Sequence, residues 1–203
     1  MTTKTPLAAP QMLQLRIVLL NTKPKIWRRV AVSSALTFRQ LHDVIQAAMG
    51  WEDCHLHEFE VGRERIGTSS KEDSFFGGEP ALSESKHRLG ELLADHKKFR
   101  YWYDFGDDWW HEITIEKRLH ASEGNPPAML LDGENACPPE DCGGPWGYVE
   151  LSAVLADPTN PEHEAMLDWM GGEFDPKAFD KEECARHVSR CVRTAAKPKK
   201  KTT

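Results

Sequence analysis

Apolar and polar residues alternate in two neighbouring segments near the start of the chain. Residues 13–20 read LQLRIVLL and residues 26–32 read IWRRVAV, and the short stretch between them contains Pro24. This alternation is typical of β-strands with one buried face, and a short turn between two such strands brings them side by side. The sequence therefore predicts an antiparallel hairpin.

The hydrophobic period becomes helical after this hairpin. Thr37 and Gln40 match a capping box, and apolar residues then recur at helical spacing from Phe38 to Ala48. Gly50 follows as a stop signal. We expect one long helix between these signals.

Three more strands are predicted at residues 57–61, 97–105 and 110–119. The last two are expected to form a second hairpin that turns at residues 106–108, Gly-Asp-Asp. Residues 68–86 are rich in Ser, Glu, Gly and Pro and lack any period, which predicts an exposed loop.

The last third of the chain predicts three short helices. The first carries an apolar stripe from Tyr148 and ends before Pro158, the second is capped by Asn160 and ends at Gly171, and the third is capped by Asp180. Helices this short need tertiary contacts to be stable, so we expect them to pack on the sheet or on one another.

This order of elements predicts an α+β fold. A hairpin, a helix and three further strands favour a β-grasp-like mixed sheet with one long helix, followed by a small C-terminal helical section. The predicted parts are a flexible N-terminus, the β-grasp-like core, a connector loop, C-terminal helices packed on the core in the same domain, and a disordered basic tail. Their bounds are 1–12, 13–119, 120–145, 146–193 and 194–203.

Charge is divided unevenly along the 203 residues. The last 18 residues carry seven basic side chains and no acid, which leaves a net charge of −13 on residues 1–185 within the total of −6. The acidic body disfavours binding of duplex nucleic acid, although the basic tail can add weak, salt-sensitive contact.

The chain has no apolar run long enough for a membrane span and no signal-like apolar segment at its start, and it has five cysteines, an odd number. We therefore expect a cytoplasmic protein without a membrane partner.

The segment 137–148, CPPEDCGGPWGY, contains two cysteines that suggest half of a metal cage. Zinc cages need four ligands, and no second closely spaced cysteine pair exists in the chain. Cys54, His55 and His57 offer the remaining ligands of a set with Cys137 and Cys142. The prolines and glycines of the segment favour the other interpretation, a rigid connector with two thiols that pack as small apolar groups.

Histidines and carboxylates are expected to meet at one edge of the sheet. His55 and His57 alternate along one strand and so face the same side, and Asp104, Asp107 and His111 surround the tip of the second hairpin, which meets them if the strands are neighbours. Such a cluster suits a transition metal or acid–base chemistry. The alternative is that each histidine bonds to loop backbone and each aspartate closes a turn, because no HExxH, phosphate-binding loop or GxSxG motif accompanies them.

Two adjacent arginines follow Trp27. Strand alternation sends Arg28 and Arg29 to opposite faces, so at most one of them is buried. A buried arginine needs a partner, and the sequence suggests a carboxylate, Asp104 or Glu58.

Several segments together match one known family: IWRRV at 26–30, LHDVIQAAMGW at 41–51, HLHEF at 55–59, YDFGDDWWHEI at 103–113, CPPEDCGGPWGY at 137–148 and DPTNPEHEAMLDWMGGEFDPKAFD at 157–180. Through these segments the chain resembles the plasmid Orf-3-like proteins of bacterial plasmids, mobile elements and chromosomes. The resemblance runs from about residue 13 to residue 180, and it implies an α+β fold without an assigned biochemical activity. Cys142 stands where this family often has an aliphatic residue, which weakens the zinc interpretation.

Some members of that family carry the label of resolvase-type passenger proteins. A serine recombinase needs a nucleophilic serine, arginines around the phosphate and a separate DNA-binding module. Ser33, Ser34 and the nearby arginines resemble the first two only faintly, and the acidic body offers no basic module. The label is therefore unsupported by the sequence.

Two functional hypotheses remain. The first is a non-catalytic module that binds a protein or a small molecule, favoured because no complete catalytic set is present. The second is a metal-dependent hydrolase or nuclease that uses His55, His57, Asp104, Asp107 and His111. No cofactor is predicted, and a divalent transition metal is the one candidate ion. The candidate binding residues are Arg28, Arg29, His55, His57, Asp104, Asp107, Trp109 and His111, and the candidate metal ligands are His55, His57, His111, Asp107, Cys137 and Cys142.

Overall fold

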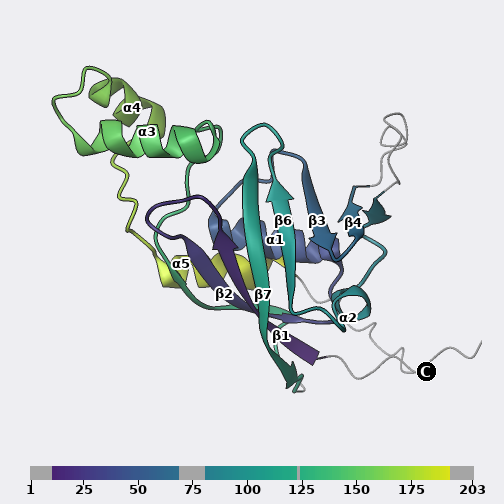
Figure 1. Cartoon of the computed structure of the whole chain (residues 1–203). Helices are drawn as coiled ribbons and strands as arrows, with labels where there is room; N and C mark the ends of the chain where they lie inside the picture. Colours follow the sequence, from purple (N-terminus) through teal and green to yellow (C-terminus); the bar gives the residue numbers. More distant parts are fainter. Residues whose placement is uncertain (1–10, 69–80, 123, 193–203) are drawn as a thin grey trace, which may run out of the picture.

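A computed structural model describes residues 11–68, 81–122 and 124–192 (Figure 1). Residues 1–10 of the expected flexible N-terminus, the basic tail and most of the expected loop at 68–86 lie outside the described residues. The first strand begins at Gln11, and Met12 is buried, so the last two residues of the expected flexible segment belong to the sheet.

The described residues form an α+β fold with one eight-stranded sheet. The strand order is β5-β4-β3-β6-β7-β1-β2-β8, and every neighbouring pair is antiparallel except β4–β5. The strands are β1 (Gln11–Leu19), β2 (Trp27–Ser33), β3 (His57–Val61), β4 (Glu64–Gly67), β5 (Leu82–Ser83), β6 (Lys98–Tyr103), β7 (Trp109–His120) and β8 (Ala128–Glu134).

The α+β class and both predicted hairpins are confirmed, but the β-grasp-like detail is not. Three strands escaped prediction, since β4 and β5 are too short to show a period and β8 lies in the segment expected to be a connector. β8 reads AMLLDGE, where a short apolar run without clear alternation gives little signal. The sheet is therefore wider than the five strands predicted.

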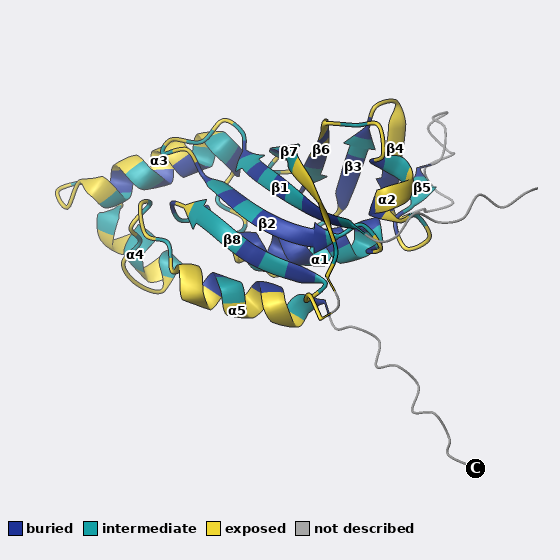
Figure 2. Ribbon diagram, turned by 90° about the horizontal axis from the view of Figure 1, so that it is seen from below, coloured by how far each residue is buried: buried dark blue, intermediate teal, exposed yellow. Residues whose placement is uncertain are grey.

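The described residues form five helices, four of which pack in two pairs. They are α1 (Phe38–Met49), α2 (Leu89–Leu92), α3 (Gly144–Ala156), α4 (His163–Met170) and α5 (Lys181–Cys191). α1 crosses one face of the sheet, and α5 lies beside α1 and along β8 (Figure 2). α3 and α4 pack against each other and extend away from the sheet (Figure 1). None of the described helices has the length and hydropathy needed to cross a membrane.

The predicted caps of α1 are both present. The Thr37 side chain accepts a hydrogen bond from the backbone N–H of Gln40, whose side chain accepts one from the backbone N–H of Thr37. At the other end Gly50 takes a left-handed conformation with φ of 90° and closes the last turn. The apolar face of α1 packs on the apolar face of β1, where Leu13, Leu15 and Ile17 are fully buried.

The guanidinium of Arg28 is buried in the core, and no carboxylate among the described residues pairs with it. Its Nε donates to the carbonyl of Ala48 at 2.8 Å, and its terminal nitrogens donate to the carbonyls of Trp27, Glu134 and Asn135 at 2.9 Å each. Burial lowers the pKa of Arg28, but a guanidinium remains charged in proteins. Four carbonyl oxygens therefore replace the carboxylate that the sequence predicted as the partner of Arg28.

The expected carboxylate partners of Arg28 are engaged elsewhere. Glu58 pairs with Arg65, and Asp104 lies near His55. Arg29 points to the opposite face of β2, as alternation predicted, and pairs with Glu116 at 2.7 Å. The Arg28 site was missed because carbonyls at strand and helix ends leave no trace in the sequence.

Replacing Arg28 is expected to destabilise the fold strongly. Arg28→Met leaves several buried carbonyls unpaired, so the free energy of unfolding should fall by about 3 kcal/mol or more. Arg29→Met is the matched control, because its ion pair with Glu116 is partly exposed to water and such pairs contribute only about 0–1 kcal/mol. Urea denaturation of both variants measures the difference, and equal losses would contradict this account of Arg28.

Candidate functional site

Four side chains form what we call the rim cluster: His55, Asp104, Glu140 and Asp141. His55 lies just before β3, Asp104 directly after β6, and the two other acids in the loop between β8 and α3. Nδ1 of His55 is 3.6 Å from Oδ2 of Asp104, and its Nε2 is 3.5 Å from Oε2 of Glu140 and 3.3 Å from Oδ1 of Asp141. Three segments that are distant in sequence thus place carboxylates on both nitrogens of one imidazole.

The backbone and a tyrosine hold two of these acids in place. Oδ1 of Asp104 accepts the backbone N–H groups of Gly106 and Asp107 at 2.9 and 3.3 Å. Oε1 of Glu140 accepts the backbone N–H of Glu52 at 2.8 Å and the hydroxyl of Tyr103 at 3.0 Å. Burial and then the adjacent Glu140 raise the pKa of Tyr103, so this hydroxyl keeps the proton that it donates.

Negative charge in the rim cluster is not balanced by a basic side chain. Among the described residues, neither lysine nor arginine forms an ion pair with Asp104, Glu140 or Asp141. The Nε2 atom of His55 is buried and makes no hydrogen bond of acceptable geometry to the described residues, although two carboxylates approach it. Ligand atoms of His55, Asp104 and Asp141 all lie within 4.8 Å of one another. Imidazole and carboxylate together suit divalent ions such as Zn²⁺, Mn²⁺ and Fe²⁺.

The rim cluster borders a cleft of about 420 Å³, within the usual size range of small-molecule sites. Glu140 and Asp141 belong to both the cluster and the cleft, and Trp51, Cys54 and Phe174 line other parts of it. Desolvation and then Glu140 and neighbouring acids raise the pKa of Cys54. This exposed thiol is therefore a poor nucleophile at neutral pH.

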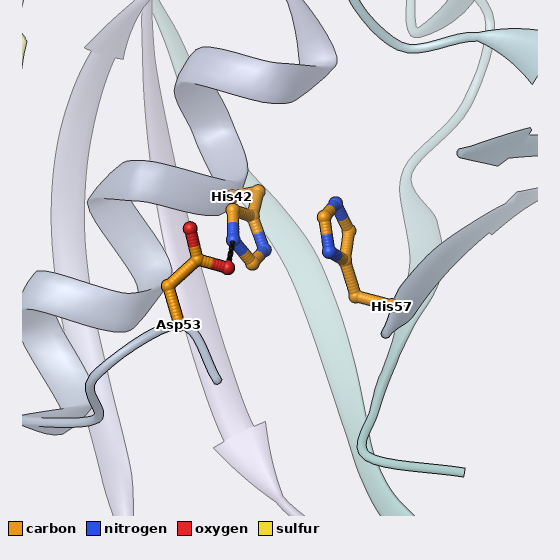
Figure 3. Close-up of side chains that lie close together, drawn as sticks. All are labelled: His42, Asp53 and His57. Carbon is orange, nitrogen blue, oxygen red and sulfur yellow. Dashed lines mark hydrogen bonds and ion pairs between the residues drawn. The ribbon is translucent and has the colours of Figure 1, made fainter. Parts of the chain in front are cut away.

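A second group, the stacked-histidine cluster, comprises the buried residues His42, His57 and Glu84 and the exposed Asp53 (Figure 3 shows His42, Asp53 and His57). The rings of His42 and His57 are stacked with centroids 3.5 Å apart and planes inclined by 12°. Each ring has its own acid: Nε2 of His42 is 2.7 Å from Asp53, and Nε2 of His57 is 2.6 Å from Glu84. Arg39 on α1 also pairs with Asp53 at 2.7 Å.

The hydrogen bonds around His42 form a closed cycle that begins and ends at Asp53. The backbone N–H of Asp53 donates to Gln46, the Gln46 amide donates to the hydroxyl of Tyr101, and that hydroxyl lies 2.8 Å from Nδ1 of His42. Because the Asp53 carboxylate needs a donor, Nε2 of His42 carries the proton and Nδ1 accepts from Tyr101. This closed set of hydrogen bonds is complete only when the imidazole of His42 is neutral. Burial, and then the adjacent His57, lower the pKa of His42 to about 4, in agreement with this assignment.

The stacked-histidine cluster is a poor metal site as it stands. Ligand atoms of His42, Asp53 and His57 lie within 4.8 Å of one another. However, the lone pairs of two parallel stacked rings point side by side, and neither ring can direct its nitrogen at a shared ion without turning. The acids already accept hydrogen bonds from the rings. We interpret this cluster as a satisfied buried network.

The structure separates several of the residues that the sequence grouped. β3 begins at His57, so alternation does not extend to His55; His57 contacts His42 in the interior, whereas His55 belongs to the rim. His111 is fully buried on β7, where its Nδ1 lies 3.3 Å from the carbonyl of Tyr101, and burial lowers its pKa to about 3. Asp107 accepts the backbone N–H of Gly143.

The surroundings of the remaining candidates, Trp109, Cys137 and Cys142, suit a structural role. Trp109 is buried against Trp51 in the core. Burial raises the pKa of Cys137, and it raises the pKa of Cys142 to about 12, so both remain thiols. Within the described ranges, neither cysteine joins a group of three or more metal-ligating side chains.

Sequence reasoning missed half of the rim cluster and most of the stacked-histidine cluster. Glu140 and Asp141 lie between the two cysteines of CPPEDC, and the prediction for this segment considered only the two thiols as ligands. His42 occupies the apolar face of the α1 pattern, which was the one available signal of a buried histidine. Glu84 follows the short β5, in a segment that was predicted to be an exposed loop.

The chain is similar to a known family, to a protein of a rhizobium and to a solved structure. A family model described as plasmid pRiA4b ORF-3-like protein matches residues 11–183. A protein of Sinorhizobium fredii (strain NBRC 101917 / NGR234), named uncharacterized protein y4hQ, is 36% identical over 193 residues, which is 93% of this chain and 97% of that protein. The crystal structure of the protein of unknown function MM3350 from Methanosarcina mazei Go1 is similar with a TM-score of 0.76 and 38% identity, over 87% of this chain and 98% of that one.

Acidification is expected to destabilise the protein through His42. An unfolded histidine titrates near 6.5 and folded His42 near 4, so the unfolded chain binds this proton first as the pH falls. The stability contributed by neutral His42 is complete above about pH 6.5 and is lost at up to ~1.4 kcal/mol per pH unit as the pH falls towards about 4. His42→Gln should reduce the pH slope of the free energy of unfolding between these values.

The control is His187→Gln, because this histidine is exposed on α5. Urea denaturation at several pH values gives the slope for each protein. A slope that stays the same after His42→Gln would contradict the neutral assignment of His42.

Proposed function

The chain belongs to the family of plasmid pRiA4b ORF-3-like proteins, and we propose that it is a non-catalytic binding module whose ligand is a divalent transition-metal ion at the rim cluster. One observation carries the proposal. One ligand atom each of His55, Asp104 and Asp141 lies within 4.8 Å of the other two, and neither acid pairs with a lysine or arginine among the described residues.

The electrostatics of the cluster support a cation. Three carboxylates around one imidazole repel one another, and partial burial of Asp104 and Glu140 reduces the screening by water. A divalent ion relieves this repulsion more fully than a single proton on His55. Asp141 is exposed, so an ion can reach the cluster from solvent.

The surroundings of the ligands also support the proposal. Asp104 and Glu140 are oriented by backbone N–H groups and by Tyr103, which is the kind of outer support that metal ligands usually have. The donor set favours Zn²⁺, Mn²⁺ or Fe²⁺ over Mg²⁺ because one ligand is an imidazole. A binding role agrees with the thiol state of Cys54, which leaves the cleft without an activated nucleophile.

Titration calorimetry with Zn²⁺ and with Mn²⁺ tests the site. We expect one ion per chain for the wild type and at least about tenfold weaker binding for His55→Ala and for Asp104→Asn, since each removes a ligand. Metal at about 100 times its dissociation constant should also add ~2.7 kcal/mol to the free energy of unfolding.

His187→Ala and Glu64→Gln are the matched controls, because each removes an exposed side chain of the same type outside the rim cluster. Binding that fails to reach one ion per chain, or that is unaffected by His55→Ala, would refute the proposed site.

A metal-dependent hydrolase is a second candidate, favoured by the cleft that shares Glu140 and Asp141 with the rim cluster. In this case the bound ion would act on a small substrate in the cleft. The assay is turnover of bis(p-nitrophenyl) phosphate by protein loaded with Zn²⁺ or Mn²⁺. Turnover that His55→Ala abolishes supports the hydrolase, whereas stoichiometric metal binding without turnover supports the binding module.

A further inference from the structure

The α3–α4 pair exposes large apolar side chains. Trp146 and Val149 on α3 are 86% and 52% exposed, and Trp169 on α4 is 51% exposed. Among the described residues, these three make up half of the strongly exposed large hydrophobic side chains. Exposed large apolar side chains that gather on one pair of helices suit an interaction site.

The two helices bury few residues in the body of the protein. Only the side of α3 that carries Tyr148, Leu151 and Val154 is buried, and no residue of α4 is buried. An ordinary surface helix has one apolar face towards the core and one polar face towards water. α3 departs from this because it carries apolar residues on its outer side as well.

A groove of about 320 Å³ runs between the two helices. Its apolar lining comes from Leu151 and Val154 on α3 and from Met166 and Trp169 on α4. Methionine and tryptophan are well suited to such a surface, because methionine adapts its shape and tryptophan offers a large contact area.

The border of the groove is acidic. Glu150 and Glu162 lie beside the apolar lining. Residues 144–170, which include both helices, contain five acidic residues and neither lysine nor arginine. Within the described part of the chain, none of these five acids forms an ion pair.

We propose that the α3–α4 groove docks a peptide segment of a partner protein that presents apolar side chains flanked by lysine or arginine. The apolar side chains would fill the groove between Leu151 and Trp169, and the basic residues would meet Glu150 and Glu162. A short amphipathic helix has this arrangement of residues and is a common occupant of such grooves.

Charge argues against the other occupants. Two copies of the chain that met through this surface would bring the same acidic border face to face, which is unfavourable in a symmetric interface. Anionic lipid headgroups and nucleic acids are negative, so the same border repels them. Asp141 lines this groove and also belongs to the rim cluster, whereas the docking proposal rests on the apolar lining and on Glu150 and Glu162.

The probe is a fluorescein-labelled 14-residue amphipathic helix of leucine and lysine, and its control is the same helix with glutamate in place of lysine. Fluorescence anisotropy with the full-length protein measures binding. We expect the lysine peptide to bind at least about tenfold more tightly than the glutamate peptide, with an affinity that falls as salt rises. We also expect Trp169→Ala and Glu162→Lys each to weaken binding at least about tenfold.

Leu119→Ala and Glu64→Lys are the matched controls, because these exposed residues lie on β7 and β4 and should leave binding unchanged. Glu150→Lys provides a second surface variant, which keeps the test valid if Trp169→Ala fails to fold. The proposal fails if both peptides bind equally or if the groove variants bind like the wild type. It also fails if the protein forms a dimer that blocks binding of the lysine peptide and that Glu162→Lys does not disrupt.

Discussion

The buried guanidinium of Arg28 is the interaction on which the arrangement of the fold depends. It joins the end of α1 at Ala48 to the end of β8 at Glu134 and Asn135, and its charge is satisfied by carbonyl oxygens. The carbonyl of Ala48 is one of those that a helix leaves unpaired in its last turn, where the helix dipole favours a cation. Phe179 stacks on the same guanidinium at 4.1 Å, so the segment that leads into α5 is held there as well.

This arrangement also fixes the loop that carries the acids of the rim cluster. The loop starts just after Asn135, and the indole of Trp51 donates to the carbonyl of Pro138 at 2.9 Å. Glu140 is then held by the backbone of Glu52. The end of α1 and the loop after β8 are therefore tied together at several points, and the rim cluster lies where these ties converge.

Two histidine clusters in one fold illustrate how partners decide chemistry. His42 has a donor or acceptor for each ring nitrogen, so its hydrogen-bonding capacity is complete without any ligand. Nε2 of His55 is surrounded by carboxylates yet makes no hydrogen bond to the described residues, so the rim cluster has unsatisfied hydrogen-bonding capacity.

The loop of the rim cluster leads directly into α3, where Gly144 takes a left-handed conformation and its backbone packs against the carbonyl of Asp107. A side chain at Gly144 would collide with that carbonyl, so the close approach of the start of α3 to Asp107 requires glycine at this position.

The sequence by itself determined the local elements whose signals are local. Alternation defined β1 and β2, and the capping box at Thr37 with the stop at Gly50 defined α1, because these patterns depend on residues within one or two turns of each other. It also separated Arg28 from Arg29, since neighbouring residues of a strand face opposite sides. The tertiary structure alone decided the partners: backbone carbonyls for Arg28, His42 for His57, and Glu140 and Asp141 for His55. Those contacts join residues far apart in the chain, and their geometry is set by the packing of β8, α1 and the loop before α3, which no local pattern encodes.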